Sequence, residues 1–355
     1  MKDHSLRKIV IGIIVFIILL LVVGFSVLML TEYEPEDIEE LTVEGEATKK
    51  LKQDEDIKLL TYNLGYLSLD STQDFFMDGG ESVMPKTASN VNKNLAAIQN
   101  LIQNEDADIY LFQEVDYKAK RSYNMNQYEG LKKDFDGTAT YAFYHKCLYI
   151  PYPIFNSVGH VESGMTILNK FALTATRIAL PSAYSWPMRA VMFKRCLMVQ
   201  RMQVENCDKE LVVINLHLEA YDDGNTRLEQ LEILKNLMLE EYEKGNYVIA
   251  GGDFNQKFPV VDNSKYPVLD DSHFSAATIP EDFLPEKWKY AVDGSKPTSR
   301  LLNEVYSGNY DNTQLYVIDG YILSPNVELK SVETIENSFS YSDHQPVRLT
   351  VKLKK

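Results

Sequence analysis

Hydrophobic residues follow two distinct patterns along the chain. Residues 9–30 form an unbroken stretch of 22 residues without a charge. As a helix that rises about 1.5 Å per residue, this stretch would be about 33 Å long, which is enough to cross a bilayer. From residue 57 onward, short apolar runs alternate with apolar positions at helical spacing, and this alternation is typical of an α/β domain.

Two strand–helix–strand units stand out in this second part. In the first unit, the apolar runs 57–64 and 108–115 flank a predicted helix, capped by Ser89 or Asn90. In the second unit, the runs 211–218 and 247–250 flank another helix. That helix follows a predicted turn at Asp222-Asp223-Gly224 and ends at Gly245, a favourable residue for a left-handed cap.

Polar residues occupy matching positions in the two units. Asn63 corresponds to Asn215, and Glu114 corresponds to Asp253. Strand–helix–strand units are common and can arise independently. The matching polar positions nevertheless favour an internal duplication.

Short strands are predicted outside these units, at 141–150, 164–169, 174–180, 194–204, 315–323 and 346–352. Aromatic residues and prolines are concentrated at 149–155 and 184–187. Such segments can form a rim that touches lipid, but aromatic residues at strand ends are usually part of a core. We therefore expect these two segments in the core.

Charges on the two sides of the apolar stretch predict its orientation. Lys2, Arg7 and Lys8 precede it, whereas an acidic segment follows it. The positive-inside rule places residues 1–8 in the cytoplasm, residues 9–30 across the membrane and the rest outside. Gly24-Phe25-Ser26 resembles the cleavage site of a signal peptide, but the stretch is longer than a usual signal core, which favours a retained anchor. Residues 31–54 are predicted to form a solvated acidic stalk before a catalytic domain at 55–355.

The overall charge and the cysteine count narrow the classes of partner. The formal net charge of −15 repels polyanions. A negative surface also releases few counterions from nucleic acid, and that release drives nonspecific nucleic-acid binding. Nucleic acid is therefore disfavoured as a substrate. The 3 cysteines leave at least one unpaired, so a disulfide framework is not indicated.

Polar residues that end or interrupt the predicted strands suggest a chemical site. Any one of them has an ordinary interpretation as a turn residue or a solvated charge, but together they supply what metal-assisted phosphoester hydrolysis requires. Carboxylates and amides suit Mg²⁺, and the absence of a closed Cys/His cage argues against structural zinc. The set is Asn63, Glu114, His217, Asp253, Asn255, Asp319, Asp343 and His344.

The sequence around these residues resembles the endonuclease/exonuclease/phosphatase superfamily. The resemblance extends from about residue 56 to 353 and rests on a series of motifs in the family's order: Thr61-Tyr62-Asn63, Gln113-Glu114-Val115-Asp116, Asn215-Leu216-His217-Leu218, Gly252-Asp253-Phe254-Asn255, Ile318-Asp319-Gly320 and Ser342-Asp343-His344-Gln345-Pro346-Val347. It implies an α/β fold, a four-layered α/β/β/α sandwich whose sheets are related by a pseudo-twofold. The N-terminal transmembrane helix would be an addition to that fold.

The resemblance also implies roles for the candidate residues. Glu114 and Asn63 would bind the principal Mg²⁺, with Asp343 nearby; Mn²⁺ or Ca²⁺ would be alternatives. Asp253 and Asn255 would orient water and the scissile phosphate. His344, held by Asp319, would act as a base or as a cation that stabilises the phosphate, and His217 would donate to a nonbridging oxygen. Arg121 and Arg300 are candidates for substrate binding, with a solvated surface charge as the alternative for each.

These features together predict a membrane-anchored, extracytoplasmic, Mg²⁺-dependent phosphoesterase. Water would attack a phosphodiester or phosphomonoester in line, and the anchor and acidic charge favour a lipid headgroup or small phosphodiester over nucleic acid. An extracytoplasmic nuclease is the second enzymatic hypothesis. A non-catalytic surface domain that keeps the fold for binding is the hypothesis of a different class.

Overall fold

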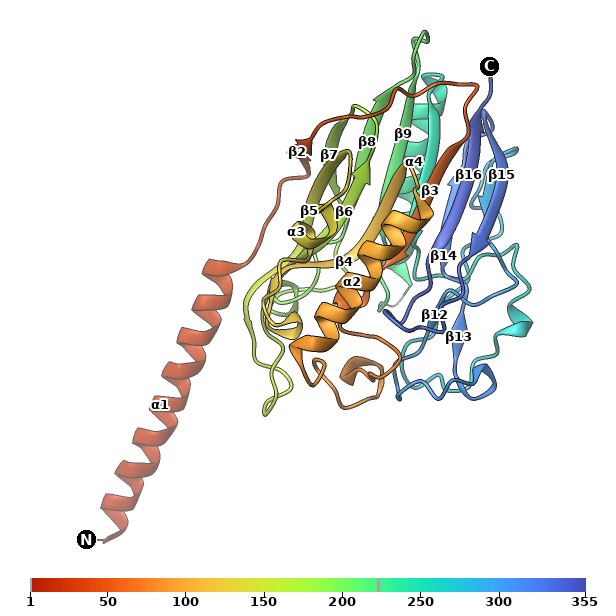
Figure 1. Ribbon diagram of the computed structural model, residues 1–355. Coiled ribbons are helices and arrows are strands. Elements are labelled where there is room, and N and C mark those ends of the chain that lie inside the picture. Colours follow the sequence, from red (N-terminus) through yellow and green to blue (C-terminus); the bar gives the residue numbers. More distant parts are fainter. Residues whose placement is uncertain (1, 222–223) are drawn as a thin grey trace.

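The computed structural model describes residues 2–221 and 224–355, so the predicted turn residues Asp222 and Asp223 lie outside the described residues. A long helix, α1 (Lys2–Thr31), projects from one end of a domain built on two stacked sheets (Figure 1). The fold is a mixed α/β fold with two large sheets, as predicted.

Each large sheet contains seven strands. The first has the order β1-β7-β8-β9-β10-β14-β11, with β1 (Ile38–Glu40), β7 (Thr174–Ala179), β8 (Cys196–Gln203), β9 (Glu210–His217), β10 (Tyr247–Asp253), β14 (Asp319–Leu323) and β11 (Lys289–Ala291). The second has the order β15-β16-β3-β4-β6-β5-β2, with β15 (Val327–Thr334), β16 (Val347–Leu353), β3 (Ile57–Asn63), β4 (Ile109–Ala119), β6 (Gly159–Asn169), β5 (Thr138–Ile150) and β2 (Val43–Gly45). A short pair, β12 (Ser299–Arg300) and β13 (Leu315–Tyr316), completes the strands named here.

The two sheets repeat one topology, which supports the predicted duplication. Each has a central parallel pair, β3 with β4 in one sheet and β9 with β10 in the other. Antiparallel strands flank both pairs in the same order. The crossover from β3 to β4 contains α2 (Ala88–Glu105), and the crossover from β9 to β10 contains α4 (Asn225–Glu243). A short helix, α3 (Gln127–Lys132), follows β4.

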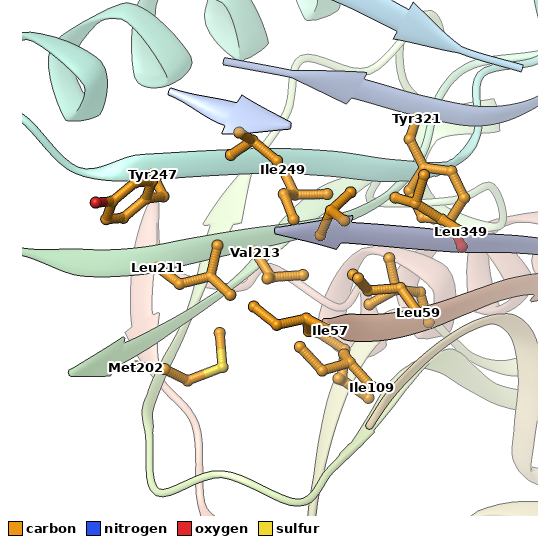
Figure 2. Close-up of a cluster of buried hydrophobic side chains, with 14 of the residues drawn as sticks. Ile57, Leu59, Ile109, Met202, Leu211, Val213, Tyr247, Ile249, Tyr321 and Leu349 are labelled. Carbon is orange, nitrogen blue, oxygen red and sulfur yellow. The ribbon is translucent and has the colours of Figure 1, made fainter. Parts of the chain in front are cut away.

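Apolar side chains fill three interfaces between four layers. Between the sheets, one cluster combines Ile57, Leu59 and Ile109 with residues of the other sheet such as Val213 and Ile249 (Figure 2). A second cluster packs α4 against the outer face of the first sheet, and a third packs α2 against the outer face of the second sheet. The order of layers is therefore helix, sheet, sheet, helix, which confirms the predicted sandwich.

Helix α1 contains the predicted apolar stretch. Its segment Leu6–Thr31 has no buried residues and is long and apolar enough to cross a membrane, and no other described helix meets that criterion. A signal sequence near an N-terminus can meet the same criterion of length and composition.

Residues 31–54 do not form a solvated stalk. Within them, β1 pairs with β7 at one sheet edge, and β2 pairs with β5 at the edge of the other sheet. Leu51 is buried and pairs with Val204. Backbone pairing with two sheet edges holds this segment in place despite its acidic composition, because most of its charged side chains remain in contact with solvent while the backbone completes the sheets.

Other local predictions need correction. Helix α2 begins after Thr87, two residues before the predicted caps. The run 315–323 is divided into β13 and β14, so Asp319 begins a strand. The aromatic segments expected in the core are exposed: Ile154 has 80% of its surface accessible, Phe155 is fully exposed, and Trp186 is 43% exposed. These residues lie in the loops β5–β6 and β7–β8, outside the three apolar clusters that join the layers.

Candidate active site

Three neighbouring strands bring three predicted site residues into one row. Asp253, the last residue of β10, is paired with His217 at the end of β9 and with Asp319 at the start of β14. Neighbouring strands lie about 4.8 Å apart, so this register places an imidazole and two carboxylates side by side. All three side chains are buried.

Asn63 connects this row to the second sheet. The Asn63 Nδ2 atom donates a hydrogen bond of 2.9 Å to Asp253 Oδ2. The Asn63 Oδ1 atom accepts a hydrogen bond of 3.0 Å from the backbone of Gly65, which fixes the orientation of the amide. The ends of β3 and β10 therefore meet across the sandwich, as the sequence predicted for residues in the two halves of the chain.

Glu114 enters the site from a β-bulge. The sequence predicted that its strand ends there, but β4 continues to Ala119, and its pairing with β6 is interrupted between Phe112 and Val115. Glu114 has a left-handed backbone (φ 55°) within this bulge. A bulge of this kind redirects a side chain, and it turns Glu114 toward His217, whose Nε2 atom lies 3.9 Å from Glu114 Oε1.

Asn215 and Gln113 form a hydrogen-bonded link between the sheets beside the site. Gln113 Nε2 donates to Asn215 Oδ1 at 2.7 Å, and Asn215 Nδ2 donates to the carbonyl of Phe112 at 3.1 Å. Asn215 was predicted to correspond to Asn63, but it lies two residues before the end of its strand and supports the sheet packing.

The loop after β10 shapes the position of Asp253. Asp253 Oδ1 accepts a hydrogen bond of 2.8 Å from the backbone of Asn255, and Asn255 Nδ2 donates to the carbonyl of Leu218 at 2.8 Å. Gly252 has φ 146°, and a Cβ atom there would lie 2.0 Å from the carbonyl oxygen of Leu216. Only glycine fits this close approach, which explains the glycine directly before the acid.

His344 and Asp319 form a buried pair. His344 Nδ1 lies 2.8 Å from Asp319 Oδ2, and His344 Nε2 lies 3.7 Å from Asp253 Oδ2. Burial alone would lower the pKa of His344, but the charges of Asp319 and Asp253 and the hydrogen bond to Asp319 outweigh it and raise that pKa well above its usual value. Burial is also the main reason that the pKa of Asp319 rises to about 6. His344 is therefore held as a cation with a fixed ring.

His217 has the opposite electrostatic character. Burial, followed by the nearby charges of Arg195 and His344, lowers its pKa well below the usual value. Its Nε2 atom lies 3.4 Å from Asp253 Oδ2, and its Nδ1 atom has no hydrogen-bond partner among the described residues. The two histidines are thus set apart, one neutral and one charged, on either side of Asp253.

The donor set beside this row fits a divalent cation. Burial and the neighbouring charge of Asp343 raise the pKa of Glu114 to about 8, and burial raises the pKa of Asp343. Two crowded carboxylates of this kind gain from a cation between them. Asp253, Asp319 and His344 also have ligand atoms within 4.8 Å of one another.

Arg121 and Arg300 have partners within the protein. Arg121 is buried, forms a bidentate pair with Asp116 and stacks over the ring of Tyr66. Arg300 is buried as well and donates to backbone carbonyls, including those of Asp70 and Gln73. Both guanidinium groups therefore support the loops around the site, and their burial excludes the interpretation as solvated surface charges. Substrate binding by Arg121 and Arg300 stays a prediction.

The sequence did not identify Arg195 as a residue near the site. It precedes β8 and is buried, and its Nε and Nη1 atoms have no hydrogen-bond partner among the described residues. Its charge acts on both Glu114 and His217, so it lies near the site. The only signal in the sequence was an arginine directly before an apolar strand, which is also common at a protein surface.

A two-sheet sandwich with acids, an amide and two histidines at one end defines the class of metal-dependent phosphoester hydrolases. The family model of the Endonuclease/Exonuclease/phosphatase family matches residues 60–273, and the chain belongs to this family. Enzymes of the family typically use divalent metal ions and hydrolyse phosphoesters. A search of curated protein sequences finds no match.

Solved structures share the fold at low sequence identity. An endonuclease/exonuclease/phosphatase from Beutenbergia cavernae DSM 12333 has a TM-score of 0.54 and 14% identity, covering 84% of this chain and 72% of that one. One from Bacteroides vulgatus has a TM-score of 0.52 and 16% identity, covering 85% and 100%. D. rerio TDP2 complexed with a single-strand DNA product has a TM-score of 0.50 and 14% identity, covering 84% and 100%.

Proposed function

We propose that the protein is a membrane-anchored, Mg²⁺-dependent phosphoesterase that hydrolyses a lipid headgroup or a small phosphodiester. The observation that carries the proposal is the arrangement around Asp253 Oδ2. This atom lies 2.9 Å from Asn63 Nδ2, 3.4 Å from His217 Nε2 and 3.7 Å from His344 Nε2. One carboxylate oxygen is thus surrounded by groups from both halves of the chain.

Asp253 is the proposed base. It accepts a proton from the attacking water while the oxygen of that water forms a bond to phosphorus. The bond from phosphorus to the leaving alcohol breaks on the opposite side, and the departing oxygen takes a proton from solvent. The hydrogen bond from Asn255 holds the other oxygen of Asp253 in place, so Oδ2 stays directed into the site.

The two histidines stabilise charge in this proposal. His344 brings a positive charge to the nonbridging phosphate oxygens, and Asp319 holds its ring. The raised pKa of His344 favours this role over that of a base. His217 remains neutral and donates a hydrogen bond, because its depressed pKa prevents it from taking a second proton.

Glu114 and Asp343 would bind the divalent ion, together with the Oδ1 atom of Asn63. Mg²⁺ is the proposed ion, and Mn²⁺ or Ca²⁺ would satisfy the same oxygen ligands. When bound, the ion would neutralise phosphate charge and position the phosphate oxygens. The side chains of Glu114 and Asp343 are the more exposed members of the site, at 14% and 11%, so they face the entry of solvent.

The proposed location is a cell membrane, with α1 as a single-pass anchor and the domain on the extracytoplasmic side. Lys2, Arg7 and Lys8 before the apolar stretch support this orientation. The net charge of −15 supports a small or lipid substrate over nucleic acid. Nuclease activity is the second candidate, because D. rerio TDP2 shares the fold and its structure contains a single-strand DNA product.

A substrate panel tests this function. The full chain in nanodiscs would be assayed with Mg²⁺ and with a chelator against glycerophospholipids, sphingomyelin, inositol phosphates, nucleotides, single-stranded DNA and plasmid. We expect chelator-sensitive phosphate or headgroup release from a lipid or small ester. Preferential cleavage of DNA would replace the lipid assignment with a nuclease, and binding without turnover of any substrate would favour the non-catalytic hypothesis.

A further inference from the structure

Two segments of the domain present apolar side chains to solvent without any charge among them. Residues 147–158, at the end of β5 and in the loop after it, and residues 178–188, at the end of β7 and in the first part of the loop β7–β8, contain no Asp, Glu, Lys or Arg, although 25% of the chain is charged. Their exposed apolar side chains form what we call the aromatic rim: Leu148, Tyr149, Tyr152, Ile154, Phe155, Trp186 and Met188. Exposed clusters of this composition mark interaction surfaces.

Strand directions place the aromatic rim at the end of the sandwich that contains the candidate active site. In the second sheet, β5 runs parallel to β4, because both are antiparallel to β6, so Ile150 lies at the same end as Glu114. In the first sheet, β7 runs parallel to β9, because both are antiparallel to β8, so Ala179 lies at the same end as His217. Both rim loops therefore leave the sheets at the active-site end.

Helix α1 leaves the domain at this same end and contacts the rim. The rings of Phe25 and Trp186 lie 5.6 Å apart, which joins the apolar helix to the loop β7–β8. In Figure 1, the yellow-green loop between β5 and β6 extends from the end of the domain near which α1 leaves. The apolar surface of the helix and that of the domain are thus continuous at Trp186.

Ion pairs at the outer end of α1 fix this arrangement. Glu32, directly after the helix, has a buried side chain and contacts Arg189 at 2.8 Å and Lys194 at 2.7 Å. The two cations lower the pKa of Glu32 despite its partial burial. Two partners on one carboxylate hold the end of the helix against the loop β7–β8, so the domain cannot turn freely about a flexible linker.

We propose that the aromatic rim enters the interface of the bilayer that α1 crosses, and that it holds the active site facing the membrane surface. Tryptophan and tyrosine are favoured at the boundary between headgroups and acyl chains, where an apolar ring and a polar edge are both satisfied. A bilayer is the occupant because α1 requires one beside Trp186. A soluble protein partner or a second copy would have to share that position with lipid.

The proposal has two parts, the position of the aromatic rim in the bilayer interface and the orientation of the active site toward the membrane surface. The second part rests on the proposed function and deepens it. A site held against the bilayer meets phosphoesters that are displayed by membrane lipids before it meets solutes. The position of the rim itself does not depend on any activity, so the two parts have separate tests.

Tryptophan fluorescence tests the position of the rim in the full chain. The protein has 2 tryptophans, and Trp288 is buried beside Tyr242 at the end of α4 away from the site. Three proteins would be placed in nanodiscs with and without brominated lipids: W186F, W186F with F155W, and W186F with D208W. Asp208 is an exposed residue in the turn between β8 and β9, at the opposite end of the sandwich.

Brominated lipids should reduce the emission of the F155W protein and leave the W186F and D208W proteins unchanged. The proposal would be overturned if neither the F155W protein nor the D208W protein changed its emission between ordinary and brominated nanodiscs. Quenching of all three proteins to the same degree would also overturn it, because the domain would then have no fixed face toward the lipid.

A charge substitution tests the consequence for the substrate. Phe155→Glu should lower the rate on a lipid phosphoester in nanodiscs several-fold and leave the rate on a soluble chromogenic phosphodiester unchanged. An unchanged rate on both substrates would contradict the membrane-facing role of the site. If the wild-type protein turns over neither substrate, the proposed function fails, while the fluorescence result still decides the position of the rim.

Discussion

Asn63 and Asp253, 190 positions apart in the chain, are joined by a hydrogen bond of 2.9 Å between the ends of β3 and β10. Each belongs to a different sheet, so the bond exists only when the two halves are packed against each other. The candidate site is therefore a product of the duplicated sandwich as a whole.

Removal of the Glu114 carboxylate should weaken metal binding. Glu114→Gln keeps the shape of the side chain but removes a charged ligand, so the affinity for Mg²⁺ or Mn²⁺ should fall by at least about 10-fold. Titration calorimetry measures this affinity, and a metal-induced rise in unfolding temperature provides a second readout. Glu129→Gln, at a half-exposed surface position, serves as the control. Unaltered metal affinity in Glu114→Gln would show that Glu114 is not a metal ligand.

Arg121 should be required for stability. Its bidentate partner Asp116 is fully buried, so Arg121→Ala leaves an unpaired charge in the core and should cost about 3–5 kcal/mol. Thermal unfolding of the full chain in micelles measures the loss, with the exposed Lys118→Ala as a control. A normal unfolding temperature together with a raised KM would instead restore the substrate-binding prediction for Arg121.

Glu241 should make stability depend on acid pH. Burial raises its pKa, but hydrogen bonds from Arg201, Lys244 and Asn246 outweigh burial and lower the pKa to about 2. Because the pKa is lower in the folded state, the stabilisation is complete above the ordinary value of 4.5 and is lost as the pH falls toward about 2.

The Glu241→Gln variant tests this linkage. It should lose about 3 kcal/mol at neutral pH and show a flatter decrease of unfolding temperature between about pH 5 and pH 2. The exposed Glu243→Gln is the matched control on the same helix. If the unfolding temperature of Glu241→Gln depended on pH as it does in the wild-type protein, the acid sensitivity would arise from other carboxylates.

Arg195 should contribute to turnover. Its buried guanidinium has two nitrogen atoms without a hydrogen-bond partner among the described residues and lies near Glu114 and His217. If these donors meet phosphate oxygens, Arg195→Lys should lower kcat/KM by about 10²-fold. Steady-state kinetics beside the surface variant Arg348→Lys measures the effect. Equal kinetics of the two variants would leave Arg195 as a structural partner of Glu219, which lies 3.9 Å away.

Regular strands and helices made much of this fold predictable. Asn63, His217 and Asp253 each end an apolar run, and the ends of strands in a layered sheet structure lie at a common edge. The sequence therefore indicated which residues meet. It did not indicate that Glu114 depends on a bulge, because the apolar run before it ends there, whereas β4 continues beyond it over residues 115–119, with charged residues among the apolar ones.

Charged and aromatic residues were harder to place. Arg121 and Arg300 looked like candidates for solvent or substrate, since arginine is mostly exposed, yet buried carboxylate and carbonyl partners satisfy them. Phe155 and Trp186 looked like core residues, yet both are exposed in loops, and Trp186 contacts Phe25 of α1. Residues 31–54 looked solvated because backbone pairing at sheet edges leaves little trace in composition. For Arg300, Trp186 and residues 31–54 the deciding partner is distant in sequence.

Hydrolysis of a chromogenic bis-aryl phosphate by the full chain tests whether Asp253 and His344 act in one catalytic site. We expect Mg²⁺-dependent release of the aryl alcohol that a chelator abolishes, and a loss of about 10²–10⁴-fold in kcat for both Asp253→Asn and His344→Gln. Circular dichroism would establish that both variants keep the fold. Retention of full activity by both folded variants would contradict the claim that the two halves of the chain form one catalytic site around Asp253.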